Sequence, residues 1–309
     1  MAIFKARTAV APHPHFKPSR FPVLVGFFLL RFLLAGNAMA IDIIPQDYVP
    51  APSGTNLTGL YYLFGQYGQL NLSGIGTFKN STNLQSNLGV FRQIRYGDFG
   101  GRAWSLQLVV PFGAADGEIA GNKLQGSSGV GDMLVSAGVS FLPHPDPRYN
   151  IGIVLYTSLP TGDYRPTRTL NLGANRFGFD AQIGYTQAIG DKFWFDAAID
   201  GIFYTVNNDA GPNHRLLSQR PTGQLQLWFG YKPDALSLVS VGYAAQTGGS
   251  QRIDGVVTGA KTESQQVRVA YQRFLTASFQ LATVLSRDIV VTGGFKETFG
   301  ATVRAIYLY

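Results

Sequence analysis

The chain has 309 residues, no cysteine, 37 glycines and only 14% charged residues, and its mean hydropathy is close to neutral. The absence of cysteine excludes a disulfide framework and thiol-based metal or redox chemistry. Water-soluble globules usually carry about 25% charged residues, so this composition favours a barrel whose strands are apolar on one side only.

The first forty residues have the pattern of an export signal. They carry five basic and no acidic residues, and an apolar run at 21–34 precedes Ala38 and Ala40, which fit a small-x-small cleavage site. Arg31 interrupts the run, which is shorter than the ~20 residues of a membrane-spanning helix. We therefore expect residues 1–40 to be removed as a signal peptide. Their removal leaves 20 basic against 18 acidic residues, so no nucleic-acid partner is expected.

Beyond Ala40 the chain repeats segments that alternate apolar with polar or small side chains, which is the period of a two-faced β-strand. Each segment has about the ~9–11 residues that a tilted strand needs to cross a membrane. The twelve predicted strands are, in chain order, 57–67, 83–96, 102–110, 129–142, 149–159, 176–189, 193–206, 222–231, 236–247, 263–273, 278–287 and 295–309.

Segment 83–96 fits the alternation least well, because Arg92 shares a face with Leu84, Leu88, Val90 and Ile94. A β-bulge near Gly89 is expected to turn Arg92 away from lipid. Alternation is clearest at 176–189 and 193–206, where one face is aromatic and aliphatic and the other carries carboxylates and amides. The polar faces predict the lumen-lining, candidate transport residues Asp180, Asp196, Asp200, Gln182, Gln224, Gln226, Gln266, Arg268, Lys296 and Arg304.

The connections indicate that the apolar face meets lipid rather than a dry core. Long connections alternate with short turns, as in outer-membrane barrels, and all twelve prolines after Ala40 fall outside the predicted strand interiors. An even strand number places both ends of the chain on the short-turn, periplasmic side. The charges on the apolar face are expected near strand ends, where they are tolerated: Glu263, Arg273, Arg287 and Glu297.

Two questions about the lumen stay open in the sequence. Asp180, Asp196 and Asp200 face Arg268, Lys296 and Arg304 across a twelve-strand ring, so the charges either create a transverse field that orients solutes or pair into a network that fills a narrow barrel. Segment 41–56 contains Pro45, Pro50 and Pro52, so it is not expected to join the sheet. It either enters the lumen as a plug, which its apolar residues favour, or extends into the periplasm.

Three short stretches resemble a known family: residues 129–138 (GVGDMLVSAG), 158–163 (SLPTGD) and 171–180 (NLGANRFGFD), together with the closing strand pair from Ala270 to Tyr309. The chain resembles the outer-membrane family described as "putative MetA-pathway of phenol degradation". The resemblance implies an outer-membrane barrel that transports aromatic or other hydrophobic compounds, and it supplies no catalytic residues.

The sequence therefore predicts an all-β, up-and-down transmembrane barrel of about twelve strands at 57–309, located in the outer membrane of a Gram-negative bacterium. The expected function is passive uptake of small, aromatic or hydrophobic solutes, without enzymatic activity, cofactor or metal. The expected partners are outer-membrane lipid, the solute, and the barrel-assembly machinery, which reads the aromatic C-terminus at Tyr309. The alternatives are a barrel hydrolase using loop-borne His214 and Asp209, and a structural anchor or adhesin.

Overall fold

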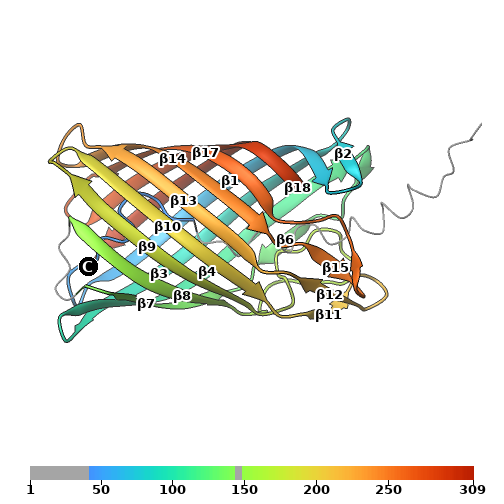
Figure 1. Ribbon diagram of the computed structural model, residues 1–309, viewed down its shortest axis with the longest axis horizontal. Helices are drawn as coiled ribbons and strands as arrows, with labels where there is room; N and C mark the ends of the chain where they lie inside the picture. Colours follow the sequence, from blue (N-terminus) through green and yellow to red (C-terminus); the bar gives the residue numbers. More distant parts are fainter. Residues whose placement is uncertain (1–41, 143–147) are drawn as a thin grey trace, which may run out of the picture.

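The computed structural model describes residues 42–142 and 148–309, which form strands, turns and loops. In this part of the chain, no helix is both long and apolar enough to cross a membrane. Eleven described strands form one closed antiparallel ring (Figure 1): β1 (Asn56–Leu72), β3 (Asn83–Phe99), β4 (Arg102–Ile119), β7 (Leu134–Ser140), β8 (Tyr149–Ser158), β9 (Gly178–Ile189), β10 (Phe193–Tyr204), β13 (Thr222–Tyr231), β14 (Ser237–Gly248), β17 (Glu263–Phe274) and β18 (Phe279–Leu308).

Strand β18 crosses the wall twice. Its residues 280–293 pair with β17 and its residues 294–308 pair with β1, which closes the ring. The amide of Leu308 donates to the carbonyl of Ser278 at 2.8 Å, so the two ends of β18 lie side by side. A closed ring in which all neighbouring strands are antiparallel needs an even number of strands. Counting the two halves of β18 separately gives that even number. The prediction of a closed antiparallel barrel of about twelve strands is therefore confirmed, with the loop expected at 288–294 reduced to a tight reversal.

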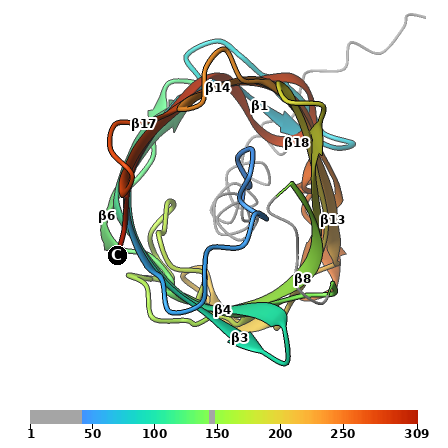
Figure 2. The same cartoon turned by 90° about the vertical axis from the view of Figure 1, so that its left-hand side faces the viewer.

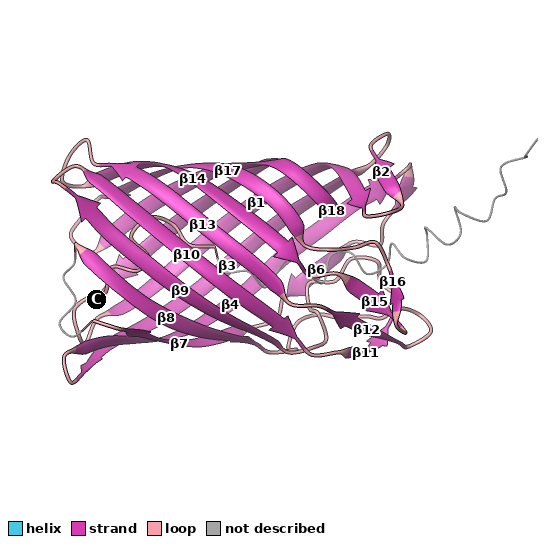
Figure 3. Cartoon of the chain, viewed as in Figure 1, coloured by secondary structure: helices cyan, strands magenta, loops and turns pink. Residues whose placement is uncertain are grey.

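The two ends of the barrel differ in the way that alternating loop lengths predict. The C-terminus and the short turns lie at one end, on the left in Figures 1 and 3, and the long connections lie at the other. We call these the short-turn end and the long-loop end. The long-loop end carries the small strands β2 (Gly76–Phe78), β5 (Asn122–Lys123) and β6 (Ser127–Val130), and a separate sheet of β11 (Asn207–Ala210), β12 (Arg215–Gln219), β15 (Gln251–Ile253) and β16 (Val256–Val257).

The apolar face of the wall points outward. Ile199 and Val241 are both 58% exposed, whereas Asp196 and Gln226 are at most 2% exposed. A strand of about ten residues rises ~3.3 Å per residue, so at the ~40° tilt of such barrels it spans roughly 25 Å, the height of the apolar band. Strands β1, β3 and β4 have 17 or 18 residues, so they project beyond that band at the long-loop end.

Two predictions about strand interiors are wrong. Pro111 lies inside β4, and the strand predicted at 129–142 is broken into β6 and β7, which pair with separate parts of β4. The two exceptions have one cause. At Pro111 the neighbouring strand is interrupted, and the proline carbonyl accepts the Gly131 amide at 2.8 Å. The sheet therefore loses few backbone hydrogen bonds through the missing N–H of Pro111.

Candidate functional site

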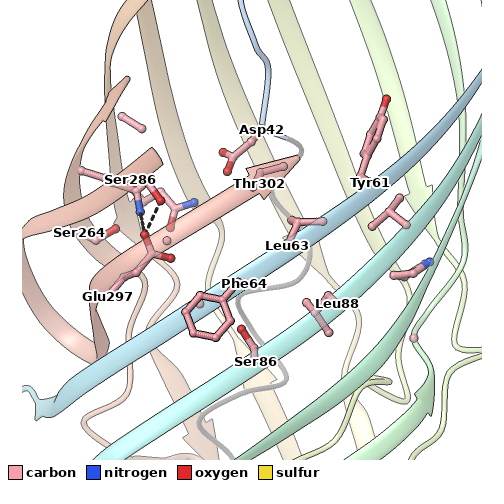
Figure 4. Close-up of a pocket in the computed structure, with 18 of the residues that line it drawn as sticks. Asp42, Tyr61, Leu63, Phe64, Ser86, Leu88, Ser264, Ser286, Glu297 and Thr302 are labelled. Atoms are coloured by element: carbon pink, nitrogen blue, oxygen red, sulfur yellow. Dashed lines mark hydrogen bonds between the residues drawn. The ribbon is translucent and has the colours of Figure 1, made fainter. Parts of the chain in front are cut away.

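The barrel lumen contains two cavities, which we call the large and the small cavity. The large cavity (Figure 4) has a volume of about 400 Å³, and the small one has about 70 Å³. The large cavity lies towards the long-loop end, because its lining includes Leu172, Thr262 and Gly293. Asp42 lines the large cavity and Tyr48 the small one, whereas Arg92 and Tyr156 line both. The segment from Asp42 to Tyr48 therefore lies between the two cavities.

Figure 2 shows this N-terminal segment (42–55) inside the ring. Its backbone is held by side chains of the wall: the Ile43 amide donates to Gln226 at 3.1 Å, and the Trp228 indole donates to the Ile43 carbonyl at 3.0 Å. Further along, the Gln46 amide donates to Asp196 at 3.0 Å. Because the segment is irregular, these bonds supply the partners that its backbone would otherwise lack. Its apolar residues also pack against the inner wall beside Trp228.

Nine of the ten candidate lumen residues lie on the inner wall, within the part of the chain that the structure describes. Eight are buried by their neighbours and the N-terminal segment, and Gln266 is half-buried at the large cavity. The buried eight are Asp180, Gln182, Asp196, Asp200, Gln224, Gln226, Arg268 and Arg304.

Lys296 is the exception, and its prediction is wrong. The pairing of β1 with β18 skips Thr298, because Gln66 is opposite Phe299 whereas Tyr67 is opposite Glu297. This bulge reverses the two faces for the residues before it. Glu297, expected on the apolar outer face, therefore lines the large cavity, while the Lys296 ammonium binds the Ile289 carbonyl at 2.9 Å.

Glu297 belongs to a polar cluster on β17 and β18. Gln266 donates to Asp288 at 3.1 Å and to Glu297 at 3.0 Å, and Ser286 donates to Glu297 at 2.6 Å (Figure 4). A second bulge, at Ile289, brings Asp288 to the inner face. This cluster forms the polar wall of the large cavity.

Two basic residues of the lumen, Arg268 and Arg304, are paired with the N-terminal segment. Arg268 binds Asp42 at 2.9 Å and Arg304 binds Asp47 at 3.4 Å, and both guanidinium side chains are 8% exposed. Nearly across the ring from Arg304, Asp196 accepts the hydrogen bond of the Gln46 amide. The contacts therefore favour a paired network that narrows the barrel over an open transverse field.

The opposite wall of the large cavity is apolar. It is formed in part by β3, where the bulge predicted near Gly89 is not found. That strand pairs with β1 and β4 without any register shift. Arg92 is kept from lipid because the whole face that it shares with Leu88 and Val90 points into the lumen. Alternation defines two faces but does not say which one is inside. The aliphatic side chains of this wall include Leu63, Leu88, Val90, Val109 and Leu134.

At the long-loop end, the three stretches that carry the family resemblance meet at Asp132. Its carboxylate accepts the Gly162 amide at 2.8 Å and the Ala174 amide at 2.7 Å, which fixes loop 159–177 against the barrel rim. Gly162 is required here, because an added Cβ would lie 2.7 Å from the Gly173 backbone. The same loop places Leu172 in the lining of the large cavity.

Burial shifts the pKa values of two groups at this rim. It raises the pKa of the Asp132 carboxyl above its usual value, although the two backbone amides act in the opposite direction. It lowers the pKa of Arg176, which stacks on Tyr204 with 4.6 Å to the ring centroid, to about 10. Both groups are outside the membrane-crossing strands.

The loop residues considered for hydrolysis do not form a catalytic arrangement. The His214 ring contacts the Asp209 carboxylate, and both side chains are exposed. Within the described residues, that carboxylate is the only hydrogen-bond partner of the His214 ring, so no nucleophile is joined to the pair. A nucleophile hydrogen-bonded to the base is the mark of such a site.

Sequence reasoning missed several residues of this site. Asp42 and Asp47 lie in an irregular segment, which has no period to show where side chains point. Asp288 and Glu297 depend on bulges. Arg92 carried a usable signal, because a lone arginine on an apolar membrane strand must face inward or lie near the membrane surface.

Comparison with solved structures supports the fold and its location. The chain matches the COG4313 outer membrane channel from Pseudomonas putida F1 at 28% identity and a TM-score of 0.82, covering 87% of this chain and all of that one. Two autotransporter barrels share the fold alone: the beta domain of BrkA from Bordetella (10% identity, TM-score 0.52, 81% and 98% coverage) and the transport unit of AIDA-I from Escherichia coli (7%, 0.52, 93% and 97%). The chain is thus an outer membrane β-barrel built like that channel.

No curated protein matches the sequence. A family model does match, over residues 64–304, which is most of the chain, and its description is "Putative MetA-pathway of phenol degradation". The chain belongs to this family.

Proposed function

We propose that this outer-membrane channel admits small aromatic or hydrophobic solutes passively through its lumen. The observation that carries the proposal is the large cavity, which has one apolar and one polar wall within a ring that is apolar outside. Small-molecule sites typically have volumes of about 300–1,000 Å³ and combine apolar surface with a few placed polar groups. The related Pseudomonas putida protein is described as an outer membrane channel, which agrees with this function.

The N-terminal segment would set the width of the route. It lies between the two cavities and is bonded to Asp196 on β10 and to Arg304 on the second half of β18, nearly across the ring, so solutes must pass beside it or displace it. This role presumes that residues 1–40 are removed during export, as their pattern predicts. Mass determination of the mature N-terminus tests that presumption.

Solute flux is the test of the proposed function. Protein refolded into liposomes is expected to accelerate entry of benzyl alcohol and of small sugars over empty liposomes, with heat-denatured protein as the control. Flux equal to that of empty liposomes would contradict the proposal. Turnover of an ester without flux would favour the hydrolase, and neither activity would favour an anchor.

Assembly in the membrane supplies two further proposed partners. The last strand presents Val303, Tyr307 and Tyr309 outward, each at least 46% exposed. Such a row suits contact with lipid, and its final aromatic residue suits recognition by the barrel-assembly machinery. Deletion of Tyr309 should then slow insertion in cells, as measured by the amount of heat-modifiable folded barrel.

A further inference from the structure

Arg92 is a lumen cation whose hydrogen bonds all go to neutral groups. Its guanidinium donates to the Gln107 amide oxygen at 2.6 and 3.1 Å and reaches the Tyr61 hydroxyl at 3.5 Å. Among residues 42–142 and 148–309, no carboxylate lies within 4.0 Å of it. Arg268 and Arg304, by contrast, each have an aspartate partner.

In the N-terminal segment, Asp47 is the carboxylate whose charge acts on Arg92, but its contacts are with other groups. Asp47 binds Arg304 at 3.4 Å and accepts the Ile44 amide at 3.1 Å. An ion that is partly removed from water without a counter-charge is costly, and such ions are ordinarily paired. Arg92 therefore has capacity for an anion that the described chain does not supply.

Tyr156, on β8, provides a second group without a partner beside Arg92. It is 4% exposed and lines both cavities, yet its phenol hydroxyl has no hydrogen bond to any described residue. A hydroxyl at the wall of a cavity can donate to a solute that enters it. A hydroxyl donor next to a guanidinium fork matches the acceptor oxygens of a carboxylate.

The cavity wall next to Arg92 is apolar, whereas Tyr156 is opposite Asp180 on β9. Val90 and Val109 flank Arg92 on the wall of the large cavity, and Leu63, Leu88 and Leu134 extend that surface. A charged head bound at Arg92 would thus leave the rest of a ligand against aliphatic side chains. The arrangement fits an anion with an apolar body, and it disfavours a strongly hydrated inorganic ion.

We propose that Arg92 and Tyr156 form a binding subsite for the carboxylate of a small aromatic or aliphatic acid, whose apolar part lies against Leu88 and Val90. This inference deepens the proposed channel function by naming the charge of the solute. It concerns equilibrium binding, so it is tested apart from flux.

The experiment compares benzoate with its uncharged analogue benzamide. Calorimetric titration of the mature protein in detergent, with a micelle-only blank, gives both affinities at neutral pH. Wild-type protein is expected to bind benzoate at least about tenfold more tightly than benzamide, because charge-assisted hydrogen bonds are the stronger ones. Arg92→Gln should lower benzoate affinity about tenfold and leave benzamide nearly unchanged.

Two further variants complete the design. Arg102→Gln removes one positive charge at the exposed short-turn end and should change neither affinity. Tyr156→Phe keeps the ring and should weaken benzoate about three- to tenfold, which tests the subsite even where Arg92→Gln fails to fold. Heat-modifiable mobility in electrophoresis reports folding of each variant.

Equal affinities for the two probes in wild-type protein, or unchanged benzoate affinity in Tyr156→Phe and folded Arg92→Gln, would overturn the subsite. So would a wild-type protein that shows no benzoate binding at millimolar concentrations. The channel function fails separately, when liposomes containing the protein show no flux of neutral solutes.

Discussion

Asp47→Asn should loosen the N-terminal segment and open the lumen. Asp47 is the counter-charge of Arg304, whose side chain is 8% exposed, and the pair is separated by 3.4 Å. The substitution keeps the size of the side chain and its ability to accept the Ile44 amide, but it removes the charge. Arg304 then remains in the lumen without an ionic partner.

The size of the effect follows from the burial of the pair. Breaking a fully buried ion pair by removing one partner costs about 3–5 kcal/mol. Asp47 is 20% exposed and one hydrogen bond survives, so we expect the lower value of about 2–3 kcal/mol. At 1.4 kcal/mol per tenfold change, the released state becomes roughly 30- to 150-fold more populated.

Single-channel recording in planar bilayers measures this population as the fraction of time spent at higher conductance. Asp234→Asn is the matched control, because Asp234 pairs with Arg273 on an exposed turn at 3.2 Å. Exposed pairs contribute little, so the control should resemble wild type. Identical conductance histograms for Asp47→Asn and wild type would refute the reasoning that the ion pair holds the segment in place.

Three other variants test separate contacts. Trp228→Phe removes the indole hydrogen bond to the Ile43 carbonyl, worth about 1 kcal/mol, and should raise the open fraction about fivefold in the same recordings; no change would show that the bond is unimportant. Gly162→Val should destabilise the rim loop by about 1–3 kcal/mol and speed its proteolysis, since its Cβ would lie 2.7 Å from the Asp132 backbone nitrogen, whereas Gly201→Ala, with 3.6 Å of clearance, should not. Burial raises the pKa of Asp132 in the folded protein, so its contribution to loop stability is complete below the ordinary value of 3.8 and is lost as pH rises through the raised value. Amide exchange between about pH 3 and pH 7, corrected for intrinsic rates, should show this loss in wild type and not in Asp132→Asn.

The barrel could be predicted because lipid imposes a strict alternation on every crossing strand. Strands such as β9, β10 and β13 follow that rule, and their boundaries agree with the predicted segments to within a few residues. Where strands leave the bilayer, the constraint ends. The extensions of β1, β3 and β4 at the long-loop end were therefore not predicted, nor was the tight reversal at Gly293 and Gly294 within β18.

The lumen was predicted only in part, because three of its features are not periodic. A bulge in β18 brings Glu297, instead of Lys296, to the inner face. On β3, alternation alone does not show which of the two faces points into the lumen. The irregular N-terminal segment contributes Asp42 and Asp47, and only tertiary contacts place them. Of the two alternatives that the sequence left open, these same features favour the paired network over the open field.

The route of the solute is tested most directly by blocking the large cavity. The chain has no cysteine, so a single Leu63→Cys substitution places a unique thiol on the cavity wall, and Val241→Cys places one on the lipid-facing surface. A water-soluble methanethiosulfonate reagent should sharply reduce benzyl alcohol flux through Leu63→Cys liposomes and leave Val241→Cys liposomes unaffected. Undiminished flux after complete modification of Leu63→Cys would contradict passage through the lumen.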